Sequence, residues 1–180
     1  NALDAMHDVI SELKQYRQTL AEQWHNPLFT VPTPTLNLGC IHGGDNPNRI
    51  CAQCELQFDL RPLPGMDMAE LRHAIRQRIN PLAERHHVSI VQSPLFDGVP
   101  PVETAADSPI VTLVESLTNQ VAGAAAFGTE APYLKQLGMD TLIFGPGDIN
   151  RAHQPDEYLS VANIAPTIRT LETLIQRFCL

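Results

Sequence analysis

Residues 35–61 read TLNLGCIHGGDNPNRICAQCELQFDLR, and this stretch decides the fold of the first half of the chain. Apolar and polar side chains alternate along residues 35–41 and again, strictly, along residues 49–61. An alternation with a period of two is typical of a strand that is buried on one face. The residues between the two runs, HGGDNPN, favour turns. The stretch therefore predicts a β-hairpin whose buried face carries Leu36, Leu38 and Cys40 on one strand and Ile50, Ala52, Cys54, Leu56, Phe58 and Leu60 on the other.

Helical periodicity flanks this hairpin on both sides. Residues 3–24 carry apolar side chains at alternating spacings of three and four, and Pro27 ends the segment. Asp67 followed by Glu70 forms a capping box with aspartate as the cap, and it predicts the start of a second helix. Residues 88–92 then predict a further short strand. The expected buried faces are Leu3, Met6, Ile10, Leu13, Leu20 and Trp24 in the first helix, and Met68, Leu71, Ile75, Ile79 and Leu82 in the second.

The resulting order of elements, α-β-β-α-β, predicts the fold class. It is an α/β arrangement, a split, ferredoxin-like β-α-β-β-α-β unit (an α+β two-layer sandwich) without its first strand. A sandwich of this kind needs that strand to cover its first helix. The chain also opens inside a helical pattern and without an initiator methionine. We therefore expect residues 1–98 to be an incomplete domain that belongs to a longer protein.

Composition changes between Ser93 and Thr104, where prolines and a glycine predict a linker. Beyond it, residues 99–180 have the pattern of the C-terminal part of an α/β domain. A short helix is expected to end near Leu137, and residues 140–144 are expected to form a buried strand. The expected buried faces of the two longer helices are Ile110, Val114, Leu117 and Val121, and Ile164, Ile168, Leu171, Ile175 and Phe178.

The composition excludes several classes of protein. The 12 Lys and Arg residues against 20 Asp and Glu give a net charge of −8, and the basic residues are scattered, so nucleic acid is not an expected partner. No apolar run approaches the roughly 20 residues of a membrane span, so no membrane partner is expected. The start of the chain has no features of a secretory signal, which predicts a cytoplasmic location with reduced cysteines.

His153 is the strongest candidate for chemistry. It lies in the loop GPGDINRAHQPDE directly after the expected buried strand, and ligands bind at such loops. A neutral imidazole there could ligate zinc, and Asp148, Asp156 or Glu157 could orient its second nitrogen. A single loop histidine is more often solvated, however, and zinc needs three or four ligands. Any metal site that uses His153 must therefore draw its other ligands from outside this chain.

Two further pairs of residues could bind an anion, and each has a simpler interpretation. Gly128 and Thr129 precede a helix start, where backbone N–H groups can approach an anion, but Thr129 can equally be an ordinary cap. Asn48 and Arg61 lie at the two ends of the long strand. An arginine suits bidentate binding of a carboxylate, but an arginine on the solvent face of a strand is the commoner case.

The cysteines allow one alternative kind of site. Two residues separate Cys51 from Cys54, and with Cys40 and His42 these cysteines could form a structural zinc knuckle. Residues i and i+3 of a strand point to opposite faces, however. The alternation therefore favours Cys54 as a small core residue instead of a ligand.

Three stretches together resemble a known family: TPTLNLGCIHGGDNPNRICAQCELQFDLRPLPGM from residue 33, FGTEAPYLKQLG from residue 127 and FGPGDINRAHQPDEYL from residue 144. They are similar to the acetylornithine deacetylases, within a family of two-zinc, aminoacylase- and carboxypeptidase-like metallopeptidases. The resemblance implies a subunit with an α/β zinc-peptidase catalytic domain and an inserted β-α-β-β-α-β dimerisation domain. Residues 1–98 would be the dimerisation domain, and residues 99–180 the C-terminal part of the catalytic domain.

The same resemblance implies a function. Enzymes of this family are cytoplasmic homodimers that act on N-acyl amino acids and hold two zinc ions per subunit, for which cobalt can substitute. The acetylornithine deacetylases release acetate from N2-acetyl-L-ornithine in arginine biosynthesis. By similarity, His153 is a metal ligand, Asn48 and Arg61 bind the substrate carboxylate, and Gly128 and Thr129 lie beside the substrate. The other ligands and the general base fall outside this sequence, so the chain alone is expected to be inactive. The alternative is a non-catalytic dimerisation domain or an amino-acid-binding regulatory module.

Overall fold

The computed structural model describes residues 1–180, which form two compact units. The first unit consists of Asn1–Pro101 with Ala124–Phe127, and the second of Val102–Gly123 with Gly128–Leu180. The short segment Ala124–Phe127 is thus flanked on both sides by residues of the second unit. No helix in either unit combines the length and the apolar character that crossing a membrane requires.

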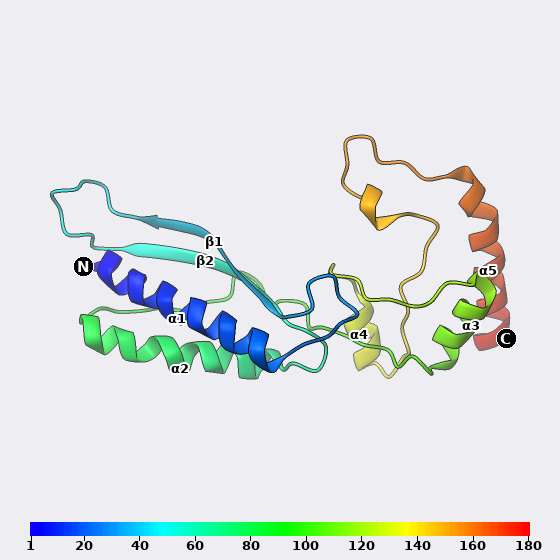
Figure 1. The fold of residues 1–180 in the computed structure, drawn as a ribbon, viewed down its shortest axis with the longest axis horizontal. Helices are drawn as coiled ribbons and strands as arrows, with labels where there is room; N and C mark the ends of the chain where they lie inside the picture. Colours follow the sequence, from blue (N-terminus) through cyan, green and yellow to red (C-terminus); the bar gives the residue numbers. More distant parts are fainter. The chain divides into compact units, whose positions relative to one another are not determined.

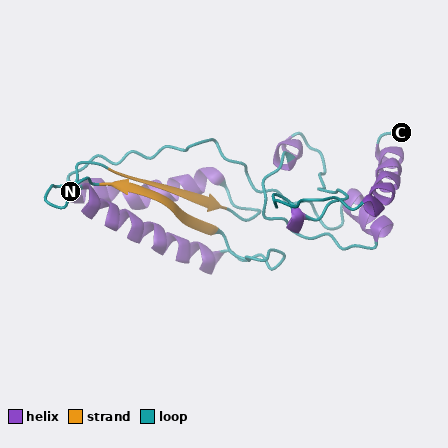
Figure 2. Ribbon diagram, turned by 90° about the horizontal axis from the view of Figure 1, so that it is seen from above, coloured by secondary structure: helices purple, strands orange, loops and turns teal.

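The first unit is a two-layer arrangement of helices on a hairpin, as the alternation and the helical stripes predict. Strand β1 (Thr35–Gly43) pairs antiparallel with β2 (Cys54–Arg61), and an irregularity in register lies between Leu38 and Cys40. Helix α1 (Ala2–Gln23) lies along the hairpin, and α2 (Met68–His86) runs beside α1 (Figures 1 and 2). The α+β fold class expected from the sequence is therefore confirmed for this unit.

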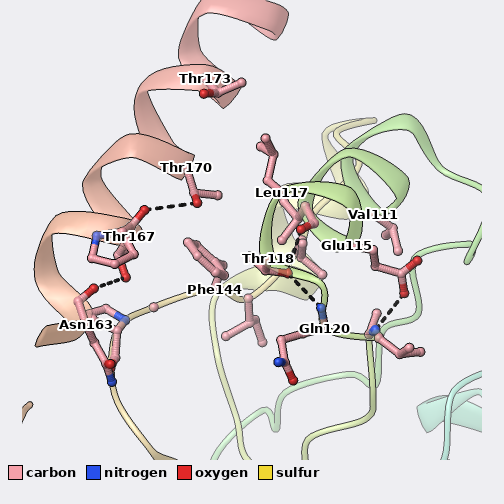
Figure 3. A pocket seen from close by; sticks show the side chains of 18 of the residues that line it. Val111, Glu115, Leu117, Thr118, Gln120, Phe144, Asn163, Thr167, Thr170 and Thr173 are labelled. Atoms are coloured by element: carbon pink, nitrogen blue, oxygen red, sulfur yellow. Dashed lines mark hydrogen bonds between the residues drawn. The ribbon is translucent and has the colours of Figure 1, made fainter.

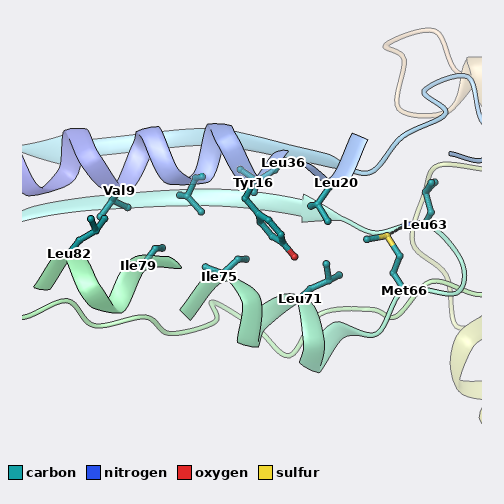
Figure 4. Close-up of a cluster of buried hydrophobic side chains, with 11 residues drawn as sticks. Val9, Tyr16, Leu20, Leu36, Leu63, Met66, Leu71, Ile75, Ile79 and Leu82 are labelled. Atoms are coloured by element: carbon teal, nitrogen blue, oxygen red, sulfur yellow. Dashed lines mark hydrogen bonds between the residues drawn. The ribbon is translucent and has the colours of Figure 1, made fainter. Parts of the chain in front are cut away.

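One continuous apolar core holds the first unit together (Figure 4). Leu13 lies at its centre with 1 % of its surface exposed. The half-buried residues Leu38, Leu56, Phe58 and Leu60 of the hairpin pack against this core, so its inward face is the one predicted from residue 54 onward. The buried members of the core are Val9, Leu13, Tyr16, Leu20, Leu36, Leu63, Met66, Leu71, Ile75, Ile79 and Leu82.

The buried face of α1 differs from the stripe expected from the sequence. The expected end members Leu3 and Trp24 are 43 % and 36 % exposed. The buried residues are instead Ala5, Val9, Leu13, Tyr16 and Leu20. The expected stripe consists of the large apolar side chains of the segment. Because α1 contacts both β1 and β2 as well as α2, the buried face is rotated toward smaller side chains and toward Tyr16.

The second strand is shorter than its alternation predicts, since it begins only at Cys54. Ile50 is 80 % exposed, and Cys51, expected on the outward face, is buried. The carbonyl oxygen of Cys51 accepts a hydrogen bond from the backbone N–H of Ala2 at 2.8 Å. Residues 49–53 therefore meet the N-terminus of α1 and have no partner strand opposite, because β1 ends at Gly43.

The expected strand at residues 88–92 is wrong, because the only sheet is the hairpin β1–β2. Ile90 packs against the core, but Val91 is 85 % exposed. In a split β-α-β-β-α-β unit the last strand pairs with the first one. The chain contains no counterpart of that first strand, so this segment lies beside the core without a ladder of hydrogen bonds.

Helix α2 begins at the cap residue that the sequence predicts, Asp67. The Asp67 side chain accepts hydrogen bonds from the backbone N–H groups of Ala69 and Glu70 at 2.7 and 2.9 Å. These bonds satisfy two of the donors that a helix start leaves free. At the other end, His87 adopts a left-handed conformation with φ 52°, which stops the helix.

The second unit is mostly helix and loop. It contains α3 (Pro109–Thr118), α4 (Ala131–Gln136), the short 3₁₀ turns η1 (Ile149–Arg151) and η2 (Val161–Asn163), and α5 (Ile164–Phe178). Helix α3 packs against α5. The helix expected to end near Leu137 is confirmed by α4.

Three expectations for the second unit are wrong. Helix α3 ends at Thr118, and Val121 beyond it is 89 % exposed. Residues 140–144 have no regular secondary structure and form no strand. The expected buried face of α5 is exposed, since its five residues expose between 39 and 53 % of their surface. The cause is common to all three: a buried strand and the faces of its flanking helices need a sheet, and this unit has none.

Candidate functional site

His153 lies in the loop between η1 and η2, after residues 140–144. Its backbone is in the left-handed region with φ 62°, and its N–H donates to Glu157 Oε2 at 3.0 Å. A left-handed histidine costs of order 1 kcal/mol and persists only where its surroundings impose it. Asp148 accepts from the backbone N–H of Asn150 at 2.9 Å. Asp148 and Glu157, two of the three carboxylates that could orient the imidazole, therefore bind the loop backbone instead.

The donor set around His153 does not make a complete metal site. Nowhere in the chain do three or more His, Cys, Asp or Glu side chains gather in a way that could hold a metal ion. His153 is exposed. It can supply one ligand, and the remaining two or three that zinc needs would come from other polypeptide.

Arg61 is oriented by two contacts within the first unit. Its Nε donates to Asp59 Oδ2 at 2.8 Å, and its Nη1 donates to the carbonyl oxygen of Ala126 at 3.2 Å. The side chain is still 66 % exposed. The guanidinium is therefore held in one orientation and accessible, which is what recognition of a carboxylate requires.

Asn48 and Arg61 are at opposite ends of the hairpin. Arg61 pairs with Thr35 at one end of the ladder, and Gly43 pairs with Cys54 at the other. Asn48 lies in the exposed turn beyond that second end, where its N–H donates to Asn46 Oδ1 at 3.1 Å. The eight residues of β2 span roughly 24 Å at the usual rise per residue. The structure thus does not bring these two residues together within one subunit.

Gly128 and Thr129 lie directly before α4. The Thr129 hydroxyl accepts a hydrogen bond from the backbone N–H of Ala131 at 3.2 Å, but the cap position of α4 is the next residue, Glu130. No atom lies within 4 Å of the position that a Cβ on Gly128 would take. The backbone at Gly128 is therefore open to a close approach from outside.

The four residues of the zinc-knuckle alternative do not form a ligand cluster. Cys40 Sγ lies 3.0 Å from His42 Nε2 on β1. The Cys51 thiol donates a hydrogen bond to the carbonyl oxygen of Gln53 at 3.0 Å. Burial, together with the nearby Cys51 thiol, raises the pKa of the Cys54 thiol above its ordinary value, which disfavours the thiolate that zinc binds.

A cavity of about 870 Å³ in the second unit was not expected from the sequence (Figure 3). It lies between α3, α5 and residues 142–147. Phe144 and Thr170 line it, and its only acidic side chain, that of Glu115, accepts from the backbone N–H of Ala122 at 2.7 Å. The lining offers no pair of groups for acid–base catalysis, so this cavity is a gap in packing and not a reaction site.

Comparisons with known proteins found one family model, several curated proteins and a solved structure that are similar to the chain. Residues 1–87 match the family model described as the peptidase dimerisation domain. The acetylornithine deacetylases of Vibrio cholerae and Edwardsiella ictaluri are 43 % and 45 % identical to the chain. Each match covers 99 % of this chain and 47 % or 46 % of the relative. The crystal structure of an M20 family metallo-carboxypeptidase from Sulfolobus solfataricus aligns over 94 % of this chain and 44 % of its own, with a TM-score of 0.57 at 15 % identity.

These matches define first a peptidase dimerisation domain in residues 1–87, within a chain whose fold is similar to that of a metallo-carboxypeptidase. Over nearly its whole length, the chain is similar to the acetylornithine deacetylases. It spans about half the length of the curated relatives it matches.

Proposed function

We propose that this chain is the C-terminal half of a metal-dependent amidohydrolase that converts N2-acetyl-L-ornithine to L-ornithine and acetate in arginine biosynthesis. The observation that carries the proposal is the 43 to 45 % identity to acetylornithine deacetylases over 99 % of the chain. The enzyme would act as a cytoplasmic homodimer through residues 1–87, which match the dimerisation domain. The isolated chain would not turn over substrate, because it offers one metal ligand and no general base.

His153 is the residue that would hold metal. The ion would be one of two zinc ions, with cobalt as a substitute, and when bound it would activate water and polarise the acetyl carbonyl as a Lewis acid. The chain's own contribution is to fix the loop backbone from which the imidazole extends. The left-handed backbone of His153 and the bond from its N–H to Glu157 hold the loop in one conformation. A ligand fixed in this way loses little conformational entropy on binding metal.

Arg61 would bind the α-carboxylate of the substrate. Its guanidinium is already oriented by Asp59 and by the Ala126 carbonyl, and it remains exposed. A planar guanidinium can give two parallel hydrogen bonds to a carboxylate, which fixes the position of the amino acid relative to the metal. The open backbone at Gly128 and the hydroxyl of Thr129 would lie along the acyl-amino group.

Asn48 would act on the substrate of the other subunit. It is separated from Arg61 by roughly the 24 Å length of β2, so the two cannot bind one carboxylate within one subunit. A two-fold dimer places the same surface of both subunits against each other and can bring the hairpin turn of one subunit to the site of its partner. Asn48 and Arg61 of different subunits would then share one substrate.

The proposal is tested by completing the enzyme. The chain is fused to the part of the Vibrio cholerae relative that has no counterpart here, and acetate release from N2-acetyl-L-ornithine is measured with zinc. We expect turnover by the fusion and none by the chain alone. His153→Ala should abolish turnover and lower the zinc content, whereas His25→Ala, at another exposed histidine, should change neither. A folded fusion without deacetylase activity would refute the function.

The sharing of Asn48 is tested separately with mixed dimers. Asn48→Ala and Arg61→Ala fusions should each be nearly inactive as homodimers. Mixing them should restore activity, because one of the two sites in a heterodimer then has both residues intact. The restored activity should approach a quarter of the wild-type value for random mixing, since half of the dimers are mixed and each has one good site. No gain above the separate variants would show that both residues belong to one subunit's site.

A further inference from the structure

A shift in strand register turns Cys40 to the outward face of the hairpin. The alternation alone predicts Cys40 on the buried face, in line with Leu36 and Leu38. In the structure Leu38 lies opposite Phe58, and the register shifts directly after it. Cys40 therefore pairs with Gln57, the neighbour of Phe58 in β2. Because neighbouring residues of a strand point to opposite faces and Phe58 packs against the core, Cys40 and Gln57 face away from the core.

His42 lies beside Cys40 on this outward face. The two residues are two positions apart on β1, and Cys40 Sγ lies 3.0 Å from His42 Nε2. His42 is exposed and Cys40 is half-buried, so small molecules can reach the sulfur. Glu55 is directly opposite His42 in the ladder, at a separation where cross-strand side chains interact. A thiol, an adjacent histidine base and a carboxylate that can orient the histidine are the groups of an activated nucleophile.

The other three thiols lack this combination of access and a neighbouring base. Cys51 is buried, and its thiol donates to the carbonyl oxygen of Gln53 at 3.0 Å. Burial raises the pKa of the Cys54 thiol, so little of the reactive thiolate forms there at neutral pH. Cys179 is exposed directly after α5. Among the four thiols, Cys40 is thus the one whose sulfur contacts a histidine.

We infer that Cys40 and His42 form a modification site at which the Cys40 thiol exchanges with disulfides of low molecular mass. His42 Nε2 accepts the thiol proton as Cys40 Sγ attacks one sulfur of the disulfide. The new bond joins Sγ to that sulfur, the S–S bond of the disulfide breaks, and the released thiolate takes the proton from His42. The exchange requires access to the sulfur, which an outward strand face provides. The site uses neither His153 nor Arg61, so it is independent of the proposed deacetylation.

The reaction of the chain with bis(2-hydroxyethyl) disulfide at pH 7 tests the site without any substitution. Mass spectrometry of proteolytic peptides measures the rate of mixed-disulfide formation at each cysteine separately. We expect Cys40 to react about tenfold faster than Cys179, because the histidine acts as a base. Exposure alone predicts the reverse order, since Cys179 is the more exposed of the two. A rate at Cys179 that equals or exceeds the rate at Cys40 would overturn the inference, as would faster modification of Cys51 or Cys54.

Substitution of the histidine tests its part in the reaction. His42→Gln keeps a polar side chain but removes the base, so the rate at Cys40 should fall about tenfold while the rate at Cys179 stays the same. His25→Gln, at another exposed histidine, is the matched control and should change neither rate. If Cys40 reacted equally fast in the wild-type chain and in His42→Gln, the histidine would have no part in the site and the inference would fail.

Discussion

Asp8 of α1 accepts a hydrogen bond from His86, the last residue of α2, with 2.8 Å between Oδ2 and Nε2. His7 Nδ1 lies 3.0 Å from the other carboxylate oxygen, and Arg85 Nη1 lies 3.6 Å from Oδ2. The contact joins residues 78 positions apart and ties the beginning of the first helix to the end of the second. The hydrogen bond from His86, followed by that from His7, holds the pKa of the Asp8 carboxyl below its ordinary value of 3.8.

The Asp8 contact predicts a pH-dependent contribution to stability. A carboxyl whose pKa is lowered by folding stabilises the native state above its ordinary pKa, and this contribution is lost as the pH falls below about 4. Asp8→Asn should therefore lower Tm near neutral pH and reduce the further fall of Tm on acidification. Thermal unfolding followed by circular dichroism over a range of pH measures both. Glu22→Gln, at an exposed carboxyl of α1, should keep the wild-type profile, and an identical profile for Asp8→Asn would contradict the prediction.

Leu13 should be the most costly apolar side chain to truncate in the first unit. It is 1 % exposed at the centre of the core, so Leu13→Ala removes buried apolar surface and leaves a cavity. The expected loss in the free energy of unfolding is about 3 kcal/mol. Urea denaturation measures it. Leu28→Ala, where the side chain is 61 % exposed, is the matched control, and a cost similar to that of Leu13→Ala would show that the core is placed wrongly.

The contribution of the Asp67 cap to the free energy of unfolding should be measurable on its own. Asp67→Ala leaves the N–H groups of Ala69 and Glu70 without their acceptor, and we expect a loss of about 1 kcal/mol in the free energy of unfolding. Asp67→Asn keeps an acceptor oxygen and should recover most of that loss. If both variants were equally destabilised, the negative charge and not the hydrogen bonds would be the source of the stability.

Two glycines of β1 should differ in their tolerance of a methyl group. A Cβ on Gly43 would lie 2.7 Å from Cys54 Sγ, closer than packed atoms approach, and 3.2 Å from its Cα, which is a tight contact. A Cβ on Gly39 would meet its nearest atoms at 3.7 Å, an ordinary contact. Gly43→Ala should therefore cost about 2 kcal/mol and Gly39→Ala much less. Urea denaturation of both variants decides the point, and equal stability would mean that the hairpin end is looser than its register indicates.

Arg61 should be more sensitive than other arginines to replacement by lysine. In the active fusion, Arg61→Lys keeps the positive charge but loses the planar pair of donors, so KM for N2-acetyl-L-ornithine should rise about tenfold with a smaller change in kcat. Arg49→Lys is the matched control, because Arg49 is also exposed and also pairs with a neighbouring carboxylate, Asp45. A similar KM for the two variants would remove Arg61 from the substrate site.

The elements that could be predicted are those whose signal is local. The hairpin follows from the alternation around Leu36 and Phe58, and the start of α2 follows from Asp67, because period and capping depend on residues a few positions apart. His153 could be placed on a loop in the same way. Its left-handed conformation could not be predicted, since the bond to Glu157 that accompanies it belongs to the folded loop.

The sequence by itself therefore determined the type and order of the helices and of the hairpin, and the fold class of the first unit. Tertiary structure alone decided where alternation becomes a strand, which face of α1 is buried, and that Asn48 and Arg61 are a hairpin's length apart. It also left residues 142–144 and the stripe of α5 uncovered. The physical reason is that an apolar pattern predicts only that a surface needs to be buried. Whether it is buried depends on a partner strand or helix, and that partner is distant in the sequence.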